Sequence, residues 1–400
     1  MTGAGALAGV PAVESARERA AGTPRIALFT NGYGYIEDGM ALTLARLVGY
    51  LEAQGIPVMV FAAVAKSAAV ASRGNVVATP SMPMPLRPEY RFAFGLSRRA
   101  RERLASFRPD IVHVTVPDLL GLQALRYARK TNTPVVASYH TRYETYLRHY
   151  RLGLLVRPLE RYLDFFYRSC RELYVPSESM MEALRPAGGA TTLRLWRRGV
   201  DTQRFNPARR SLPWRRARGI ADDDVVVAFV SRLVREKGLT TLTETLRGLR
   251  RLGIRPRSVI VGDGPEDQAL RSALPDSVFT GFLRGGELAT AYASADIFLF
   301  PSETETFGNV TLEAMASGLP AVCADATGSR SLVAHGVTGY LAPPGDAEAF
   351  VGHVAALVRD AELRQRMSDA ARRRSLDFSW DAEMARLVGY YRSILAEPAR

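Results

Sequence analysis

Cysteine is scarce in this chain of 400 residues, and the two that occur, Cys170 and Cys323, lie far apart and form no CxxC pair. Their spacing argues against a disulfide framework and against a zinc site, and it fits a reducing cytoplasm. No uncharged run approaches the roughly 18 apolar residues that would predict a membrane-spanning helix. Residues 1–23 have no lysine or arginine before their apolar part, so they predict no secretory signal, and we interpret them as a flexible leader.

Acidic residues are too few to balance the basic ones. The chain has 53 lysines and arginines against 40 aspartates and glutamates, a formal net charge of +13. Such an excess indicates an anionic partner: nucleic acid, a membrane surface or a phosphorylated substrate. Residues 91–108 hold six arginines against one glutamate, and residues 142–171 hold seven arginines against three acids. The excess therefore lies mostly in the first half and the middle of the chain.

The remaining composition is that of a soluble globular protein, with 47% hydrophobic and 23% charged residues. A chain of this length is too long for one compact core, so two domains are expected. Short runs rich in β-branched residues alternate with longer helical patterns. The runs are residues 25–30, 57–63, 110–114, 134–138 and 172–177, then residues 225–232, 258–264, 277–281, 296–302, 320–325 and 339–343. This alternation predicts an α/β fold with parallel sheets and crossover helices.

The two sets of runs predict two doubly wound, Rossmann-like domains, at residues 24–193 and 219–378. Between them, residues 194–218 carry nine arginines and one acid and show no helical or strand period, so they are the predicted linker. Residues 379–400 have an amphipathic helical pattern, and we expect this helix to pack back on the first domain. Doubly wound sheets bind ligands beyond the carboxyl ends of their strands, so the site is expected in a central cleft between the domains.

The run at 296–302 leads into the segment SETETFGNVTLEAMASGLP, residues 302–320, in which two glutamates are spaced eight apart. Gly308 permits a close backbone approach, and the helix that follows offers free N–H groups and the positive end of its dipole to an anion. A phosphate would be stabilised there, and Glu305 and Glu313 could reach different parts of one ligand. Alternatively, Glu305 is a solvated loop charge and Glu313 is a first-turn glutamate favoured by the helix dipole.

Companion segments occur along the chain. They read LWRRGVDTQRFNP at 195–207, VSRLVREKGL at 230–239, IVGDGPEDQAL at 260–270 and FTGFLRGGELATAYASAD at 279–296. Together with the segment at 302–320 they resemble the motifs of retaining glycosyltransferases of family 4, which have the GT-B fold. The resemblance covers nearly the whole chain, and it implies two Rossmann-like domains that face a central cleft.

The resemblance implies metal-independent transfer of a sugar from a nucleotide diphosphate to a hydroxyl, with retention at the anomeric carbon. No cofactor is implied, because the nucleotide sugar is a substrate. The acidic run ADDDV at 221–225 precedes a strand as a turn, so we do not interpret it as a metal site. In the family, retention is usually assigned to same-face attack, in which the leaving phosphate helps to deprotonate the acceptor.

The resemblance also implies roles for single residues. Arg232 and Lys237 would hold the donor diphosphate. Glu305 would orient sugar hydroxyls, and Glu313 would bind the ribose. His140 would lie beside the donor sugar, although an isolated histidine is more often a structural residue. The predicted catalytic residues are therefore His140, Arg232, Lys237 and Glu305. The predicted donor-binding residues are Gly39, Gly262, Gly264, Phe282, Leu283, Arg284, Phe307, Gly308, Asn309, Val310 and Glu313.

Two basic segments bear on the acceptor. Residues 142–171 interleave aromatic side chains with arginines, as do amphipathic segments that bind an anionic bilayer; the alternative is an ordinary domain helix with exposed arginines. The candidates for membrane or acceptor contact are Tyr143, Tyr146, Arg148 and Arg151, with Arg98 and Arg99 in the other segment. The segments SYHT and SETETFG are similar to those of glycolipid-forming members of the family.

We therefore expect a UDP-sugar donor, a lipid acceptor of the diacylglycerol or ceramide type, and a cytoplasmic protein at the inner face of the membrane. GDP-mannose is the alternative donor. A basic polyanion-binding protein without catalysis would also explain the charge of +13, but no RNA-binding signature is present and no nucleic-acid partner is expected. Another enzyme of the same fold, a nucleotide-sugar epimerase or a phosphorylase, is a further alternative.

Overall fold

The computed structural model describes residues 23–34, 39–64, 74–84, 87–140, 154, 156–185 and 191–397, except for the side chains of residues 87–90. Nearly all of the predicted leader lies outside the described residues, as do Tyr143, Tyr146, Arg148 and Arg151. The chain folds into two compact units: unit 1 comprises residues 1–136 and 385–400, and unit 2 comprises residues 137–384. The predicted domain boundaries stay predictions.

Unit 1 is built of strands and helices in alternation. Its strands are β1 (Ile26–Thr30), β2 (Val58–Ala63), β3 (Asn75–Thr79), β4 (Ser81–Met84), β5 (Arg87–Ala93) and β6 (Ile111–Val114), and its helices are α2 (Gly39–Ala53), α3 (Arg98–Phe107) and α4 (Leu119–Thr131). Strand β7 (Val135–Ser138) begins in unit 1 and ends in unit 2, and strands β8 (Glu172–Val175) and β9 (Thr192–Leu195) belong to unit 2. The first sheet has the order β3-β2-β1-β6-β7-β8-β9, and β4 and β5 form a separate antiparallel pair.

The centre of unit 1 is a parallel sheet that is covered on both faces. Ile26 of β1 pairs with Val58 of β2 and with Ile111 of β6. Every residue of these three strands is buried, as expected for parallel strands that read as continuous apolar runs. Phe29 and Phe61, which are partners in this register, stack with ring centroids 4.8 Å apart.

The last helix, α16 (Trp380–Ala396), ends in unit 1. There Tyr391 is buried, and its hydroxyl oxygen lies 2.6 Å from Nδ1 of His113 on β6. Burial lowers the pKa of His113 to about 3, so the imidazole is neutral at physiological pH. This hydrogen-bonded pair joins the end of the chain to the core of unit 1.

Unit 2 contains the second sheet and most of the helices. Its further strands are β10 (Val226–Val230), β11 (Arg257–Val261), β12 (Val278–Gly281), β13 (Ile297–Phe300), β14 (Ala321–Ala324) and β15 (Gly339–Ala342). Its helices are α6 (Val156–Arg168), α7 (Glu178–Leu184), η3 (Pro207–Arg209), α8 (Leu212–Arg216), η4 (Arg235–Lys237), α9 (Leu239–Arg251), α10 (Asp267–Ala273), α11 (Gly285–Ala293), α12 (Asn309–Ala316), α13 (Thr327–Leu332), α14 (Ala347–Arg359) and α15 (Ala361–Ser375). The sheet is parallel with the order β12-β11-β10-β13-β14-β15.

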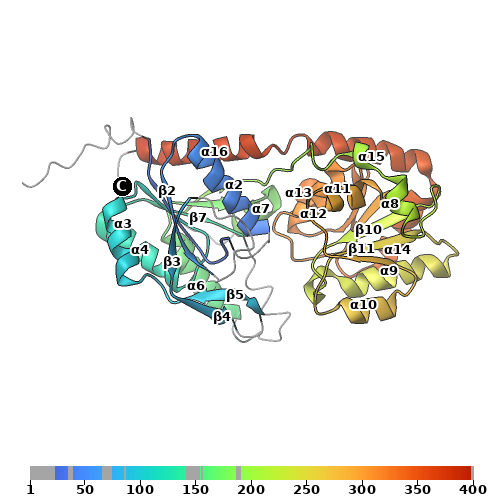
Figure 1. Ribbon diagram of the computed structural model, residues 1–400, viewed down its shortest axis with the longest axis horizontal. Coiled ribbons are helices and arrows are strands. Elements are labelled where there is room, and N and C mark those ends of the chain that lie inside the picture. The colour runs from blue at the N-terminus through green and yellow to red at the C-terminus, as the bar shows by residue number, and fades with distance from the viewer. Residues whose placement is uncertain are drawn as a thin grey trace, which may run out of the picture. The chain divides into compact units, whose positions relative to one another are not determined.

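This second sheet is doubly wound, as the alternation of runs and helices predicted. Helices α9 and α14 lie on one side of it and α11 and α12 on the other (Figure 1). Every run predicted as a strand is confirmed, whereas β3, β4, β5 and β9 were missed. β3 and β9 are short edge strands; β3 has a polar residue at each end, and in β9 threonine and arginine alternate with leucine, so neither reads as a long apolar run. Among the described residues, no helix is long and apolar enough to cross a membrane.

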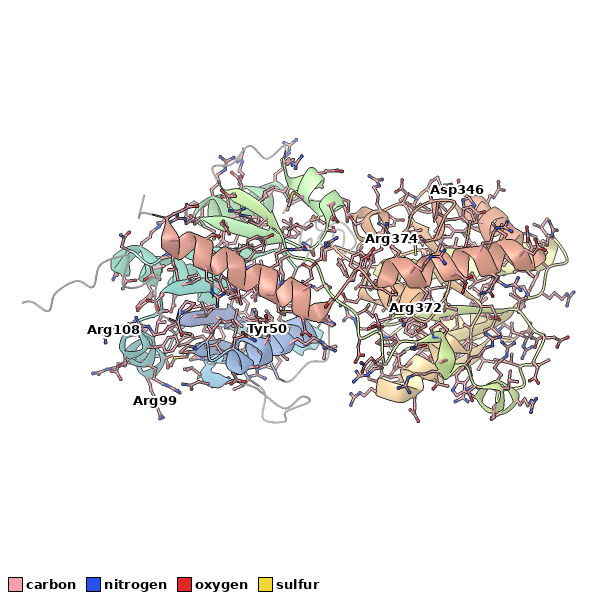
Figure 2. All side chains as sticks on the ribbon, turned by 90° about the horizontal axis from the view of Figure 1, so that it is seen from above. Tyr50, Arg99, Arg108, Asp346, Arg372 and Arg374 are labelled. Carbon is pink, nitrogen blue, oxygen red and sulfur yellow. The ribbon has the colours of Figure 1, made fainter. Side chains whose placement is uncertain are left out.

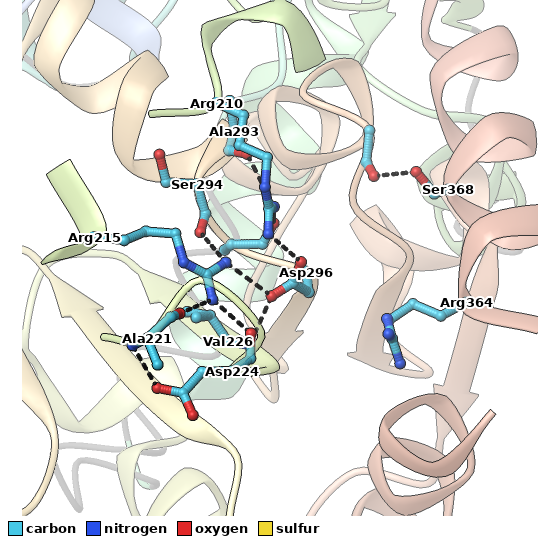
Figure 3. A network of polar contacts seen from close by, with 12 residues as sticks. Arg210, Arg215, Ala221, Asp224, Val226, Ala293, Ser294, Asp296, Arg364 and Ser368 are labelled. Carbon is cyan, nitrogen blue, oxygen red and sulfur yellow. Dashed lines mark hydrogen bonds and ion pairs between the residues drawn. The ribbon is translucent and has the colours of Figure 1, made fainter. Parts of the chain in front are cut away.

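The arginine-rich segment at 194–218 is more ordered than its lack of period predicted, because it contains η3 and α8. Both are too short to show a helical repeat, but each has a proline in its first turn and a side-chain N-cap. Arg215 of α8 is fully buried and pairs with Asp296 (Figure 3). Its guanidinium also donates to the carbonyl oxygens of Ala221, Asp224 and Ser294. Part of the positive charge of this segment is therefore internal.

Candidate active site

Two of the predicted motifs follow neighbouring strands of the second sheet. β10 and β13 pair in the middle of this sheet. From this pair, β11 and β12 extend the sheet on one side and β14 and β15 extend it on the other, so the strand order reverses here. Residues 231–238 follow β10, and residues 301–308 follow β13. In doubly wound sheets, ligands bind beyond the carboxyl ends of the strands at such a reversal. This edge of unit 2 is the candidate active site.

Gly262 and Gly264, which follow β11, pack against the loop after β10. A Cβ atom at Gly262 would lie 1.8 Å from the carbonyl oxygen of Ser231, and one at Gly264 would lie 2.4 Å from that of Leu233. Gly262 also has a φ of 136°, which residues with side chains rarely adopt. Glycine at both positions lets the two loops meet, and their contact fixes the backbone that carries Arg232.

Lys237 and Glu305 form an ion pair that joins the loop after β10 to the loop after β13. Their side chains are 14% and 16% exposed, so a ligand can still reach both. The hydroxyl of Ser302 donates to Oε1 of Glu305 at 3.3 Å. Arg232 is half-buried, and no ion pair or hydrogen bond of its side chain is found in the part of the chain that the structure describes. Its guanidinium is suited to a bidentate contact with a phosphate.

The backbone of Glu305 is fixed by the start of α13. Its carbonyl oxygen accepts hydrogen bonds from the amide of Gly328 and the hydroxyl of Thr327, both at 2.8 Å. A Cβ atom at Gly328 would lie 2.8 Å from Cβ of Glu305, so only glycine permits this approach. The carboxylate of Glu305 is therefore held on a rigid support.

Helix α12 begins at the end of the same loop without a side-chain cap, and its N-cap is Gly308 with a φ of 97°. The first N–H groups of a helix have no intrahelical partners and attract anions. The side-chain oxygen of Asn309 is buried, and it has no hydrogen-bond partner among the described residues. A buried polar atom without a protein partner calls for a donor from outside the chain, such as a water or a ligand.

Glu313 lies farther along α12 and is half-buried. Its Oε2 accepts a hydrogen bond from the hydroxyl of Tyr292 on α11 at 3.2 Å. Burial raises the pKa of Tyr292 well above its ordinary value, and the negative charge of Glu313 adds to this shift, so the phenol stays protonated and donates. Tyr292 was missed as a site residue, because an aromatic residue within an apolar helix predicts only core packing.

The other predicted donor-binding residues differ in exposure. Phe282 is 54% exposed, and the guanidinium carbon of Arg284 lies 4.9 Å from the centroid of its ring. Leu283 packs against the core of unit 2. Phe307 is buried against Phe378, with ring centroids 6.1 Å apart, whereas Val310 is half-buried. Gly39 is the first residue of α2 in unit 1, where Arg98 and Arg99 begin α3.

His140 follows β7 in unit 2, and both of its ring nitrogens have protein partners. Nε2 lies 2.7 Å from the hydroxyl oxygen of Ser138, and Nδ1 lies 2.5 Å from Nη2 of Arg198. The carbonyl oxygen of His140 accepts a hydrogen bond from the hydroxyl of Thr306 at 3.1 Å. The structure thus brings His140 to the loop that carries Glu305, and its catalytic role stays a prediction. No group of three or more histidine, cysteine or acidic residues suited to a metal ion occurs within the described ranges.

Two family models match the chain. The model for glycosyltransferase family 4 matches residues 38–204, and the model for glycosyl transferases group 1 matches residues 212–374. The sulfoquinovosyl transferase of Arabidopsis thaliana is 35% identical, over 91% of this chain and 72% of that protein. A GDP-mannose-dependent α-mannosyltransferase of Mycobacterium tuberculosis is 40% identical, over 74% of this chain and 76% of that protein. The α-monoglucosyldiacylglycerol synthase of Streptococcus pneumoniae is 30% identical, over 74% of this chain and 70% of that protein.

Solved structures show the same fold. The sucrose-phosphate synthase of Thermosynechococcus elongatus superposes with a TM-score of 0.75 at 20% identity, over 93% of this chain and 99% of that one. Anabaena HepE in complex with UDP superposes with a TM-score of 0.70 at 20% identity, over 92% of this chain and 100% of that one. The alternative of a non-catalytic polyanion-binding protein is therefore wrong, and the chain belongs to glycosyltransferase family 4, as an enzyme with the GT-B fold.

Proposed function

We propose that this glycosyltransferase moves a hexose or hexuronic acid from a UDP-sugar to a hydroxyl of a membrane lipid of the diacylglycerol or ceramide type, with retention. The proposal depends above all on the ion pair of Lys237 and Glu305 beside the uncapped start of α12. This arrangement joins a group that can orient sugar hydroxyls to groups that can bind a diphosphate.

In the proposed reaction, the bond between the anomeric carbon and the diphosphate oxygen breaks, and the acceptor oxygen bonds to the same face of that carbon. Arg232, Lys237 and the N–H groups of residues 307–310 stabilise the negative charge that grows on the leaving diphosphate. Lys237 has three donors, so it can contact a phosphate oxygen while it stays paired with Glu305. The leaving phosphate oxygen takes the proton of the acceptor hydroxyl. His140 lies beside the sugar, and no metal or cofactor takes part.

The activities of similar proteins support a lipid acceptor and are consistent with either of two donors. The sulfoquinovosyl transferase and the α-monoglucosyldiacylglycerol synthase favour a sugar transferred in glycolipid synthesis, and the HepE complex contains UDP. GDP-mannose is the second candidate donor, because the similar α-mannosyltransferases depend on it. The exposed Arg98 and Arg99 support peripheral contact with the anionic inner face of the membrane.

The function is tested by incubating the protein with a panel of nucleotide sugars and total membrane lipid, and by mass spectrometry of the lipid products. A new glycolipid from one UDP-sugar is the expected result. Product from GDP-mannose alone would mean that the donor is GDP-mannose and not a UDP-sugar. Conversion of a nucleotide sugar without lipid indicates an epimerase, and conversion that requires free phosphate indicates a phosphorylase.

Glu313→Gln tests the donor site directly. A carboxylate accepts stronger hydrogen bonds from ribose hydroxyls than an amide does, so we expect affinity for UDP to fall by about tenfold to a hundredfold. Isothermal titration calorimetry measures this change. Glu303→Gln is the matched control, since Glu303 is exposed in the same loop and should leave the affinity unchanged. Equal affinities of wild type and Glu313→Gln for UDP would contradict the proposed role of Glu313 in donor binding.

A further inference from the structure

Arg198 is a buried cation to which the sequence motifs gave no role in the site. It is 5% exposed, its Nη1 has no hydrogen-bond partner among the described residues, and no carboxylate there pairs with it. Its guanidinium contacts His140 and lies 5.2 Å from the ring centroid of Trp196. Burial lowers the pKa of Arg198 to about 10, which still leaves the group charged at physiological pH.

This arrangement disfavours folding. A charge that is removed from water without a counter-charge costs several kcal/mol, and an apolar side chain of similar volume is often more stabilising. Buried groups that lower the stability of the fold in this way are expected at functional sites. The position of Arg198 next to the predicted site residue His140 fits that expectation.

The backbone around Arg198 is held on both sides. The amide of Trp196 donates to the carbonyl oxygen of Val175 at 2.8 Å, and the amide of Val200 donates to that of Phe378 at 3.0 Å. A Cβ atom at Gly199 would lie 2.4 Å from the amide nitrogen of Trp380, so the chain passes close to the start of α16 here. The side chain of Arg198 is therefore presented to His140 from a fixed backbone.

The contact determines the protonation of His140. A guanidinium can only donate hydrogen bonds, so Nδ1 of His140 accepts from Arg198. The proton of the neutral imidazole is then on Nε2, which donates to the hydroxyl of Ser138 at 2.7 Å. With Nδ1 engaged and Nε2 protonated, the ring is not placed to take a proton from an acceptor hydroxyl.

We propose that Arg198 is a positioning residue for glycosyl transfer and that it acts through His140. Arg198 fixes the orientation and tautomer of the imidazole, and His140 in turn supplies the carbonyl oxygen that Thr306 contacts at 3.1 Å. Thr306 directly follows Glu305, whose carboxylate pairs with Lys237. A continuous path of contacts thus leads from the buried guanidinium to the predicted diphosphate site. This inference rests on the proposed function, because it assigns Arg198 to the same reaction.

A double-mutant cycle on kcat tests the inference, with the nucleotide sugar and membrane lipid that yield product in the screen. We expect Arg198→Met and His140→Phe each to lower kcat by about tenfold or more, while KM for the donor changes less than about threefold. The double variant should be no slower than the slower single variant, because both changes interrupt one path. Losses that multiply in the double variant would overturn the inference.

Chemical rescue separates positioning by a cation from support of the fold. In Arg198→Ala, millimolar guanidinium chloride should restore part of kcat, whereas urea, which has a similar shape and no charge, should not. Arg198→Ala combined with His140→Phe should not respond to guanidinium. Restoration by both additives, or by neither in a folded variant, contradicts the proposal. Should Arg198→Ala fail to fold, Arg198→Lys keeps a charge and a donor, and its kcat should lie between those of wild type and Arg198→Met.

The neighbouring Arg197 provides a matched control. Its guanidinium pairs with Glu383 and Glu178 and not with His140, so Arg197→Met should lower the thermal unfolding temperature without a selective loss of kcat. An equal loss of kcat in this control would assign the effect to the whole segment and overturn the role of Arg198. A wild-type protein that yields no product with any nucleotide sugar would contradict the proposed function instead. An active wild type with Arg198 variants of unchanged kcat would contradict only this inference.

Discussion

Two sets of arginines in this chain lie in contrasting surroundings; Figure 2 labels a member of each, Arg372 on α15 and Arg99 on α3. The interior set of unit 2 comprises the fully buried Arg215 and the partly buried Arg372, and it donates mainly to main-chain carbonyl oxygens. For Arg372 these are the oxygens of Thr202, Phe205 and Ala316, at 2.6 to 3.2 Å. The surface set, Arg98 and Arg99 of unit 1, is exposed, and its ion pair is that of Arg98 with Glu102 one helical turn away.

The contrast shows that the net charge of +13 has more than one origin. Interior arginines donate to main-chain carbonyl oxygens in turns and at helix ends, so they belong to the fold. The surface set stands in the first turn of α3, where the helix dipole disfavours cations, and this turn contains no acidic residue. Folding does not explain these two arginines, which favours a role in binding an anionic partner.

Arg215→Met should produce the largest effect on stability. Methionine fills much of the space but leaves Asp296 and three carbonyl oxygens short of a donor, so unfolding should require about 3 kcal/mol less free energy. Urea unfolding followed by circular dichroism measures the difference. Arg216→Met is the control, because Arg216 pairs with Asp222 on the surface and its loss should not change the midpoint. Equal effects of the two variants would remove the distinction between interior and surface arginines.

Much of the fold could be predicted from the sequence, because parallel strands that are covered on both faces read as continuous apolar runs. β1, β10 and β13 are clear examples, since every one of their residues is buried. The edge strand β9 carries polar residues and has only one neighbour, so its sequence resembles a loop. Prediction therefore worked at the centre of each sheet and at both edges of the second sheet, and it failed at the two edges of the first sheet, β3 and β9.

The residues of the candidate site also differ in whether the sequence alone could identify them. Gly262, Lys237 and Glu305 occur in local motifs, and the resemblance of these motifs to those of the family selected them; their roles stay predictions. Arg198 and Tyr292 depend on contacts with residues 58 and 21 positions away along the chain, which no local pattern encodes. The burial of Arg215 could not be predicted from the sequence either, since nine arginines in a short segment predict a solvated surface.

Arg372→Met should have an intermediate effect. Arg372 is only partly buried, so we expect a loss of about 1 to 2 kcal/mol in the free energy of unfolding from its carbonyl contacts. The neighbouring Arg373 is exposed on the same helix, and Arg373→Met is the matched control. Thermal unfolding monitored by calorimetry compares the two. A larger loss in the control would mean that helix propensity, rather than contact with carbonyl oxygens, sets the stability of α15.

The double change Arg98→Gln with Arg99→Gln should leave stability unchanged and alter binding alone. Each arginine near an anionic bilayer contributes on the order of 1 kcal/mol, so binding to phosphatidylcholine vesicles that contain phosphatidylglycerol should weaken by about tenfold to thirtyfold. Sedimentation with vesicles measures this, and high salt should remove the difference. Arg359→Gln with Arg366→Gln removes the same charge from exposed positions of unit 2, and Arg366 has a similar pair one turn from Glu362. If this control weakened binding equally, net charge alone would attract the protein to the membrane. If neither double variant mattered, the surface arginines would not contact it, and their place at the start of α3 would need another cause.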